Sequence, residues 1–143
     1  MSYVYTKISA AEWRERFEEN ARLSVFGEHV DPKTTRFDFS ILCAHEKHLC
    51  IYTTVREIHS DHAYLSFGGS FPNVRGQTEI VRPAFLGLID WFFSNGYDQI
   101  TFHTKNTNYP MQRLSMHAGF VCVGTSTTER HILLEYNLKK EIK

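Results

Sequence analysis

The stretch "NTNYPMQRLSMHAGF", Asn106 to Phe120, decides the fold. Pro110 suits the first turn of a helix, because the N–H groups of that turn have no partner within the helix and proline has none to lose. Gly119 suits the position just after a helix end. The preceding "YDQITFHT", residues 97–104, has the alternating apolar and β-branched composition of a strand. The stretch therefore predicts a strand, a short helix, and a return into another strand at Phe120.

The rest of the chain also alternates between strand-like and helix-like segments. Ser9, with Glu12 three residues later, has the spacing of a capping box at a helix start. Proline inside a helix removes a hydrogen bond, so Pro83 predicts either regular helix beginning near Ile80 or later, or a kink. Residue types and periodicity predict helices over 10–23, 79–95 and 109–118, a loop over 27–35, and strands over 3–8, 37–45, 49–58, 63–71, 97–104, 120–127 and 131–138.

This order predicts one α/β (α+β) domain over residues 1–143. Three consecutive strands with short breaks predict antiparallel neighbours. The strands at 63–71 and 97–104 are joined through a helix, which predicts that they are parallel and adjacent. The expected fold is a mixed, mostly antiparallel sheet of about seven strands with a central parallel pair, flanked by helices.

The composition indicates a folded protein. Apolar residues make up 42% of the chain, and 16 basic residues balance 16 acidic ones. This balance provides no overall charge for attracting nucleic acid or a membrane surface. No stretch approaches the roughly 20 apolar residues of a membrane span. The N-terminus becomes polar too early for a signal peptide, and three cysteines do not make a disulfide framework. We therefore expect a cytoplasmic protein.

The element order, together with the opening stretch, resembles the GNAT superfamily of acyl-CoA-dependent N-acyltransferases. That family often has an Asn, apolar residues three and six positions later, a Tyr seven later, and Gly-Phe eleven and twelve later. The corresponding residues here are Asn108, Met111, Leu114, Ser115, Gly119 and Phe120. The resemblance implies that Asn108 contacts the pantetheine arm of CoA.

The resemblance also implies a CoA-binding surface on the fourth strand and the loop after it. The family's pyrophosphate loop reads Arg/Gln-x-x-Gly-x-Gly/Ala, and here Thr78 and Ile80 replace its two glycines. The loss of these glycines predicts a reshaped loop, because glycine permits a positive φ and close backbone approach to phosphate. The implied contacts are Phe67, Gly68, Gly69 and Ser70 on the strand and Arg75, Gly76, Gln77 and Thr78 in the loop.

The catalytic groups are less well defined. Ser115 occupies the position of the family's usual acid, a tyrosine, and a serine hydroxyl is a poorer acid. Histidine titrates near neutrality and suits proton removal from an ammonium group. Several groups near the predicted parallel pair therefore remain as alternative bases, of which we single out Glu57, His62 and His103.

The expected function is transfer of an acetyl group from acetyl-CoA to a primary amine of a small molecule or a protein. A GNAT-like binding or structural module without catalysis is the alternative. The partners are then CoA and the amine acceptor, with a homodimer possible. The run "CAHEKHLC" also holds zinc-type ligands at Cys43, His45, His48 and Cys50, but a plain hairpin explains it better and no metal is expected.

Overall fold

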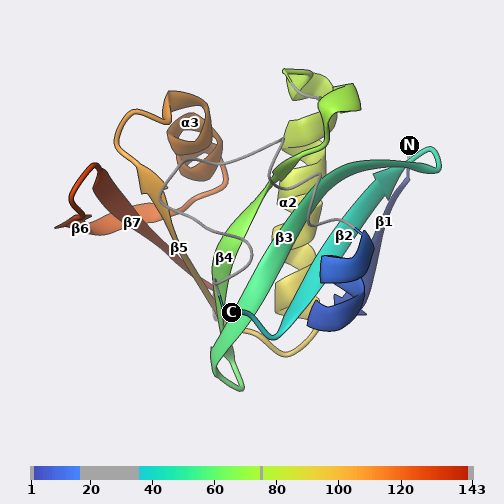
Figure 1. Ribbon diagram of the computed structural model, residues 1–143, viewed down its shortest axis with the longest axis horizontal. Coiled ribbons are helices and arrows are strands. Elements are labelled where there is room, and N and C mark those ends of the chain that lie inside the picture. The colour runs from blue at the N-terminus through green and yellow to red at the C-terminus, as the bar shows by residue number, and fades with distance from the viewer. Residues whose placement is uncertain (1, 17–35, 75, 142–143) are drawn as a thin grey trace.

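The computed structural model describes residues 2–16, 36–74 and 76–141. Its seven strands form one sheet in the order β1-β2-β3-β4-β5-β7-β6 (Figure 1). The strands are β1 (Tyr3–Ser9), β2 (Phe39–His45), β3 (His48–His59), β4 (His62–Ser70), β5 (Gln99–Lys105), β6 (Val121–Thr127) and β7 (Ile132–Lys139). The helices are the short η1 (Pro72–Val74), α2 (Thr78–Ser94), α3 (Tyr109–His117) and the helical residues 10–16. The predicted fold class is confirmed.

The sheet is parallel at one place, between β4 and β5. These strands pair from His62 opposite Gln99 to Leu65 opposite Phe102, and the pairing ends there although both strands continue. The other neighbouring pairs of described strands are antiparallel. The predicted crossover through α2 is therefore correct, and it leaves a sheet whose two central strands part midway.

Helices cover both faces of the sheet. The helical residues 10–16 lie on one side and α2 on the other (Figure 1). Trp13 is fully buried and meets the rings of Phe37 and Phe67 edge-on, at centroid distances of 5.6 and 5.2 Å. Phe85 and Phe92 of α2 belong to a second and larger apolar cluster on the opposite face. Two separate clusters therefore hold β4 from its two sides.

The start of α2 differs from the expectation. The helix begins at Thr78, one residue before the predicted range 79–95, and Pro83 lies inside it. Of the two alternatives, a regular helix that starts only at Ile80 or later is therefore wrong, and a kink at Pro83 stays a prediction. The Gln77 carbonyl accepts the N–H groups of both Ile80 and Val81, which closes the first turn ahead of the proline. Pro83 costs the helix one hydrogen bond, and packing of the apolar face outweighs that loss. The predicted residues 17–23 of the first helix and the loop 27–35 lie outside the described residues.

The zinc-type ligands of the hairpin between β2 and β3 do not form a cluster of three or more among the described residues. Glu46 and Lys47 form a two-residue turn with φ of 51° and 69°, and His45 stacks on the Tyr3 ring at 4.6 Å. The thiols of Cys43 and Cys50 are fully buried, with their sulfur atoms 3.5 Å apart. No group of three metal-ligating side chains gathers anywhere in the described part of the chain. Nor does a helix of that part have the length and apolar character to cross a membrane.

Candidate active site

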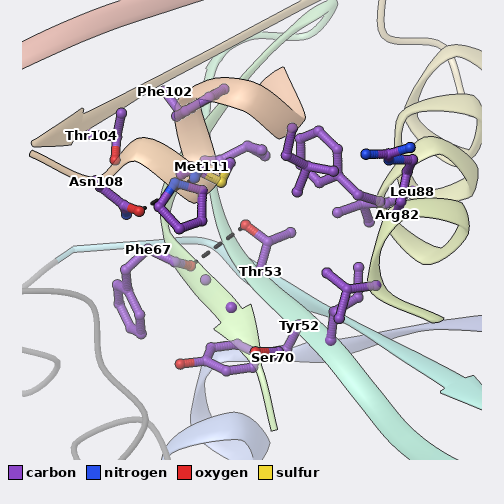
Figure 2. Close-up of a pocket in the computed structure, with 18 of the residues that line it drawn as sticks. Tyr52, Thr53, Phe67, Ser70, Arg82, Leu88, Phe102, Thr104, Asn108 and Met111 are labelled. Carbon is purple, nitrogen blue, oxygen red and sulfur yellow. Dashed lines mark hydrogen bonds between the residues drawn. The ribbon is translucent and has the colours of Figure 1, made fainter. Parts of the chain in front are cut away.

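A cavity of about 520 Å³ opens where β4 and β5 part. Residues of β4 from Leu65 to Ser70 form one wall, and Phe102, His103 and Thr104 of β5 form another. Figure 2 shows Asn108 and Met111 on one side of the cavity and Arg82 and Leu88 of α2 on the other. The fold thus leaves a lined space at the place where the parallel pairing ends.

A bulge in β4 shapes this wall. Val55 pairs with Leu65 and Thr54 pairs with Phe67, so Ser66 is an extra residue in the ladder. The extra residue reverses the facing of the strand: Leu65 packs in the α2 cluster, whereas Phe67 packs in the cluster around Trp13. The Ser66 hydroxyl is buried in the cavity wall and has no hydrogen-bond partner among the described residues. A ligand in the cavity would remove the cost of that unsatisfied group.

Beyond the bulge, β3 and β4 lie so close together that only glycine fits at position 68. A Cβ at Gly68 would lie 2.6 Å from the Tyr52 carbonyl oxygen and 3.0 Å from the Thr53 Cα. Gly68 is therefore required by its neighbour β3. The backbone of Phe67 is also occupied: its N–H donates to the Thr54 hydroxyl at 3.2 Å, and that hydroxyl donates to the Phe67 carbonyl at 3.0 Å. All four predicted cofactor contacts on this strand, Phe67, Gly68, Gly69 and Ser70, line the cavity.

The start of α2 forms the polar end of the cavity. Gly76 has φ of +84°, and Thr78 is the first helical residue. Because Thr78 and Ile80 already lie within the helix, the positive φ that the family pattern assigns to later glycines is provided by Gly76 instead. The N–H groups of a helix start attract anions. Gln77 does not line the cavity and donates its side chain to a backbone carbonyl.

Two exposed arginines, Arg82 of α2 and Arg113 of α3, line the cavity. Their guanidinium groups are suited to binding phosphate. Arg113 lies in α3, which the sequence reasoning treated only as the carrier of the Asn108 motif. The predicted contact Arg75 lies outside the described residues.

Asn108 joins the cavity to the start of α3. Its side-chain oxygen accepts the Met111 N–H at 3.3 Å, so Asn108 is the N-cap of the helix (Figure 2). Asn108 also lines the cavity. The cap uses the oxygen, and the carboxamide NH₂ group remains as a donor for a cofactor.

Three of the predicted catalytic residues lie away from the cavity. Ser115 is fully buried, and its hydroxyl donates to the Met111 carbonyl at 2.6 Å within α3. Glu57 accepts the Tyr97 hydroxyl, beyond the start of the parallel pair. His62 opens β4 and lies 2.8 Å, Nε2 to Oγ1, from Thr101. The cavity is at the other end of the pair from Glu57 and His62, and Ser115 is not among its lining residues although Met111 and Leu114 of the same helix are.

His103 is the predicted base that does line the cavity. Its Nδ1 lies 2.6 Å from the Tyr64 hydroxyl, and its Nε2 lies 3.2 Å from Oε1 of Glu135. Burial raises the pKa of Tyr64, and the charge of Glu135 raises it further, while Arg56 opposes them. The sequence reasoning missed Tyr64 and Glu135, because only the pairing of β4, β5 and β7 places them beside His103.

Comparison with known proteins places the fold. No family model matches the chain, and no curated protein matches its sequence. Among solved structures, the ribosomal-protein-S18-alanine N-acetyltransferase of Escherichia coli has a TM-score of 0.72 at 15% identity, covering 99% of this chain and 96% of its own. An IAA acetyltransferase from Bacillus cereus has a TM-score of 0.71 at 10% identity, and the match covers 96% of this chain and 99% of the acetyltransferase. A ribosomal L7/L12 alpha-N-protein acetyltransferase in complex with coenzyme A has a TM-score of 0.61 at 13% identity. That match covers 71% of this chain and 62% of the acetyltransferase.

In the first two of these structures the similarity covers nearly the whole of both chains. The chain therefore has the GNAT fold, that of the acyl-CoA N-acyltransferases. The resemblance inferred from Asn108 to Phe120 is confirmed at the level of the fold.

Proposed function

We propose that this protein transfers an acetyl group from acetyl-CoA to a primary amine. One observation carries the proposal: a single cavity is lined by the start of α2, by the two arginines Arg82 and Arg113, and by His103 of β5. A long cofactor with phosphates at one end and a thioester at the other matches that lining. An expected location in the cytoplasm and a possible homodimer remain part of the proposal.

The cofactor is proposed to lie along β4. Arg82, Arg113 and the N–H groups at the start of α2 provide positive potential for its phosphates. Asn108 provides an amide donor for the pantetheine arm, and Gly69 and Ser70 provide backbone beside it. The comparison structure of the L7/L12 acetyltransferase, which holds coenzyme A, supports this assignment at the level of the fold.

The reaction requires the thioester to be held, the amine to lose a proton, and the thiolate to be protonated as it leaves. His103 provides the titratable group at the thioester end of the cavity. The names of two structural neighbours refer to an alanine of a ribosomal protein and to spermidine and spermine. The acceptor proposed here is therefore a primary amine of a small molecule or of a protein.

Titration calorimetry with CoA and with acetyl-CoA tests the cofactor, using Arg82→Ala and Arg113→Ala against a surface control, Arg16→Ala. We expect binding that weakens in the first two variants and is unchanged in the control. Absence of binding at millimolar CoA would reject the proposal.

A thiol-release assay with a panel of amines tests the chemistry. Release of CoA that depends on an added amine is the expected result. Ser115 in place of the family's tyrosine favours the alternative, a binding module without catalysis. Binding of acetyl-CoA without release against any amine would select that alternative.

A further inference from the structure

Three side chains form a chain of hydrogen-bonding contacts across three strands. Tyr64 of β4 contacts Nδ1 of His103 on β5, and Nε2 of His103 contacts Glu135 on β7, at 2.6 and 3.2 Å. His103 is the residue directly after the last parallel pair and lines the cavity. The side chains of His103 and Glu135 are 26% and 41% exposed. Of the three, His103 lines the cavity, and the Tyr64 hydroxyl lies one hydrogen bond away from it, so the acceptor would reach Tyr64 beside His103.

A neutral imidazole between a carboxylate and a phenol has one arrangement of protons that satisfies both contacts. An ionised carboxylate only accepts hydrogen bonds, so Nε2 of His103 carries a proton toward Glu135. The other nitrogen of a neutral imidazole only accepts, so the Tyr64 hydroxyl donates to Nδ1. Both ring nitrogens are then occupied. The phenolic oxygen of Tyr64 still has lone pairs, which makes it the free proton acceptor of the chain.

We propose, on the premise of the acetyl transfer above, that Tyr64 takes a proton from the acceptor's ammonium group while its own proton passes to Nδ1 of His103. Tyr64 is then the catalytic residue that meets the amine. Glu135 acts through His103 as a positioning residue, because it fixes the tautomer and stabilises the imidazolium that forms.

The protons and bonds balance over the reaction. The ammonium group loses one proton to the relay, and the free amine forms a bond from its nitrogen to the thioester carbon. The carbon–sulfur bond breaks, and the departing thiolate takes a second proton from the attacking nitrogen. The proton on His103 then leaves to solvent beside Glu135, which restores the starting state. The products are an amide, CoA as the thiol, and one released proton.

Other titratable groups surround the relay. Arg56 lies opposite Tyr64 in the register of β3 and β4, and its charge favours the ionised phenol. His62 precedes Tyr64 on β4 and is engaged with Thr101. Lys105 follows on β5 from His103. Among the described residues, Glu135 is the carboxylate in contact with His103, so it is the group whose charge the relay requires.

Kinetics of matched variants test the relay. The variants are Tyr64→Phe and Glu135→Gln. The control is Tyr97→Phe, which removes a tyrosine hydroxyl that is bonded to the carboxylate of Glu57 and makes no contact with His103 among the described hydrogen bonds. Thiol release is followed with benzylamine, spermidine and a peptide with an amino-terminal alanine. We expect kcat/KM to fall about 100-fold or more near neutral pH in the first two variants. The control is expected to keep the wild-type rate.

The pH dependence separates a relay from a structural role. The loss in Tyr64→Phe is expected to shrink as the pH rises through the pKa of the amine itself, because free amine then forms in solution. A loss that is the same at every pH, or no loss beyond that of the control, would overturn the proposal.

A measurement that needs no acceptor keeps the two proposals apart. Nitrogen-15 NMR of the free protein is expected to show the neutral ring of His103 protonated at Nε2, with a changed Nδ1 shift in Tyr64→Phe. A ring protonated at Nδ1 would overturn the relay even if the protein turns over. Failure of every amine to release thiol, with no CoA binding, would reject the acetyl transfer instead.

Discussion

Replacement of Gly68 by alanine tests how β3 and β4 shape the cavity. The new Cβ would lie 2.6 Å from the Tyr52 carbonyl oxygen and 3.0 Å from the Thr53 Cα. Both atoms are backbone atoms of β3, so no side chain can rotate away. We expect β4 to shift away from β3, which destabilises the fold and narrows the cavity on the side of Gly68.

The expected magnitude follows from the costs of overpacking. Forcing one extra methyl group into a packed site costs about 1–3 kcal/mol. An unfolding entropy of about 2.1 cal/mol/K per residue sums to about 0.3 kcal/mol/K for a chain of this length, so the melting temperature should fall by about 3–10 °C. The affinity for CoA should fall as well.

Gly124→Ala is the matched control. Gly124 also lies in a strand, and a Cβ there would meet nothing within 4 Å. Relief of glycine's conformational entropy should make this variant neutral or more stable by up to about 1 kcal/mol. Urea unfolding monitored by circular dichroism compares the free energies of unfolding, and calorimetry compares CoA binding. A Gly68→Ala protein as stable as Gly124→Ala would refute the reasoning.

Three further changes separate the roles of residues around the site. Asn108→Asp keeps the cap of α3 and loses the amide donor, so the free energy of unfolding should change by less than about 0.5 kcal/mol. The Kd for CoA should rise about fivefold or more. Equal Kd values for the variant and the wild type in calorimetry would contradict the contact. Ser115→Ala should keep kcat within about twofold, because its hydroxyl bonds Met111 inside the helix; a tenfold loss in the thiol assay would restore it as a candidate acid. Burial, and then the hydrogen bond to Glu57, raise the pKa of Tyr97 above its usual value of 10.0 in the folded state. The protonated hydroxyl therefore stabilises the fold fully below pH 10, and this contribution is lost as the pH rises through the folded pKa. Urea midpoints from pH 9 to 12 should fall less steeply in Tyr97→Phe, and parallel slopes would contradict this.

The order of elements was predictable from the sequence because periodicity and end signals are local. Ser9 accepts the Glu12 N–H at 3.1 Å, as the capping box predicts, and Gly96 and Gly119 adopt the positive φ expected after their helices. The parallel pairing of β4 and β5 followed from the helix pattern between them, since parallel strands need a crossover connection, which is usually a helix. These features depend on residues a few positions apart.

The site was less predictable because it depends on register and strand direction. The cavity lies at the carboxyl end of β4, whereas Glu57 and His62 flank the turn at its opposite end. Spacing placed Ser115 correctly on α3, but a short hydroxyl side chain readily bonds the carbonyl four residues earlier. Glu135 meets His103 only because β7 inserts between β5 and β6, and no pattern in the chain gives that insertion.

The two adjacent thiols of the β2–β3 hairpin, Cys43 and Cys50, make the local opening of the sheet measurable through their rate of chemical labelling. Cys122 is exposed and should react with a thiol reagent at once, whereas Cys43 and Cys50 are fully buried. The hydrogen bond to Cys50, together with burial, raises the pKa of Cys43, so its thiol stays protonated and unreactive until the hairpin opens. Mass spectrometry should therefore detect one fast and two slow labelling events. The two slow rates report how often this hairpin opens, and no cysteine has to be introduced for the measurement. The thiol reagent that detects released CoA can also be used to measure these labelling rates.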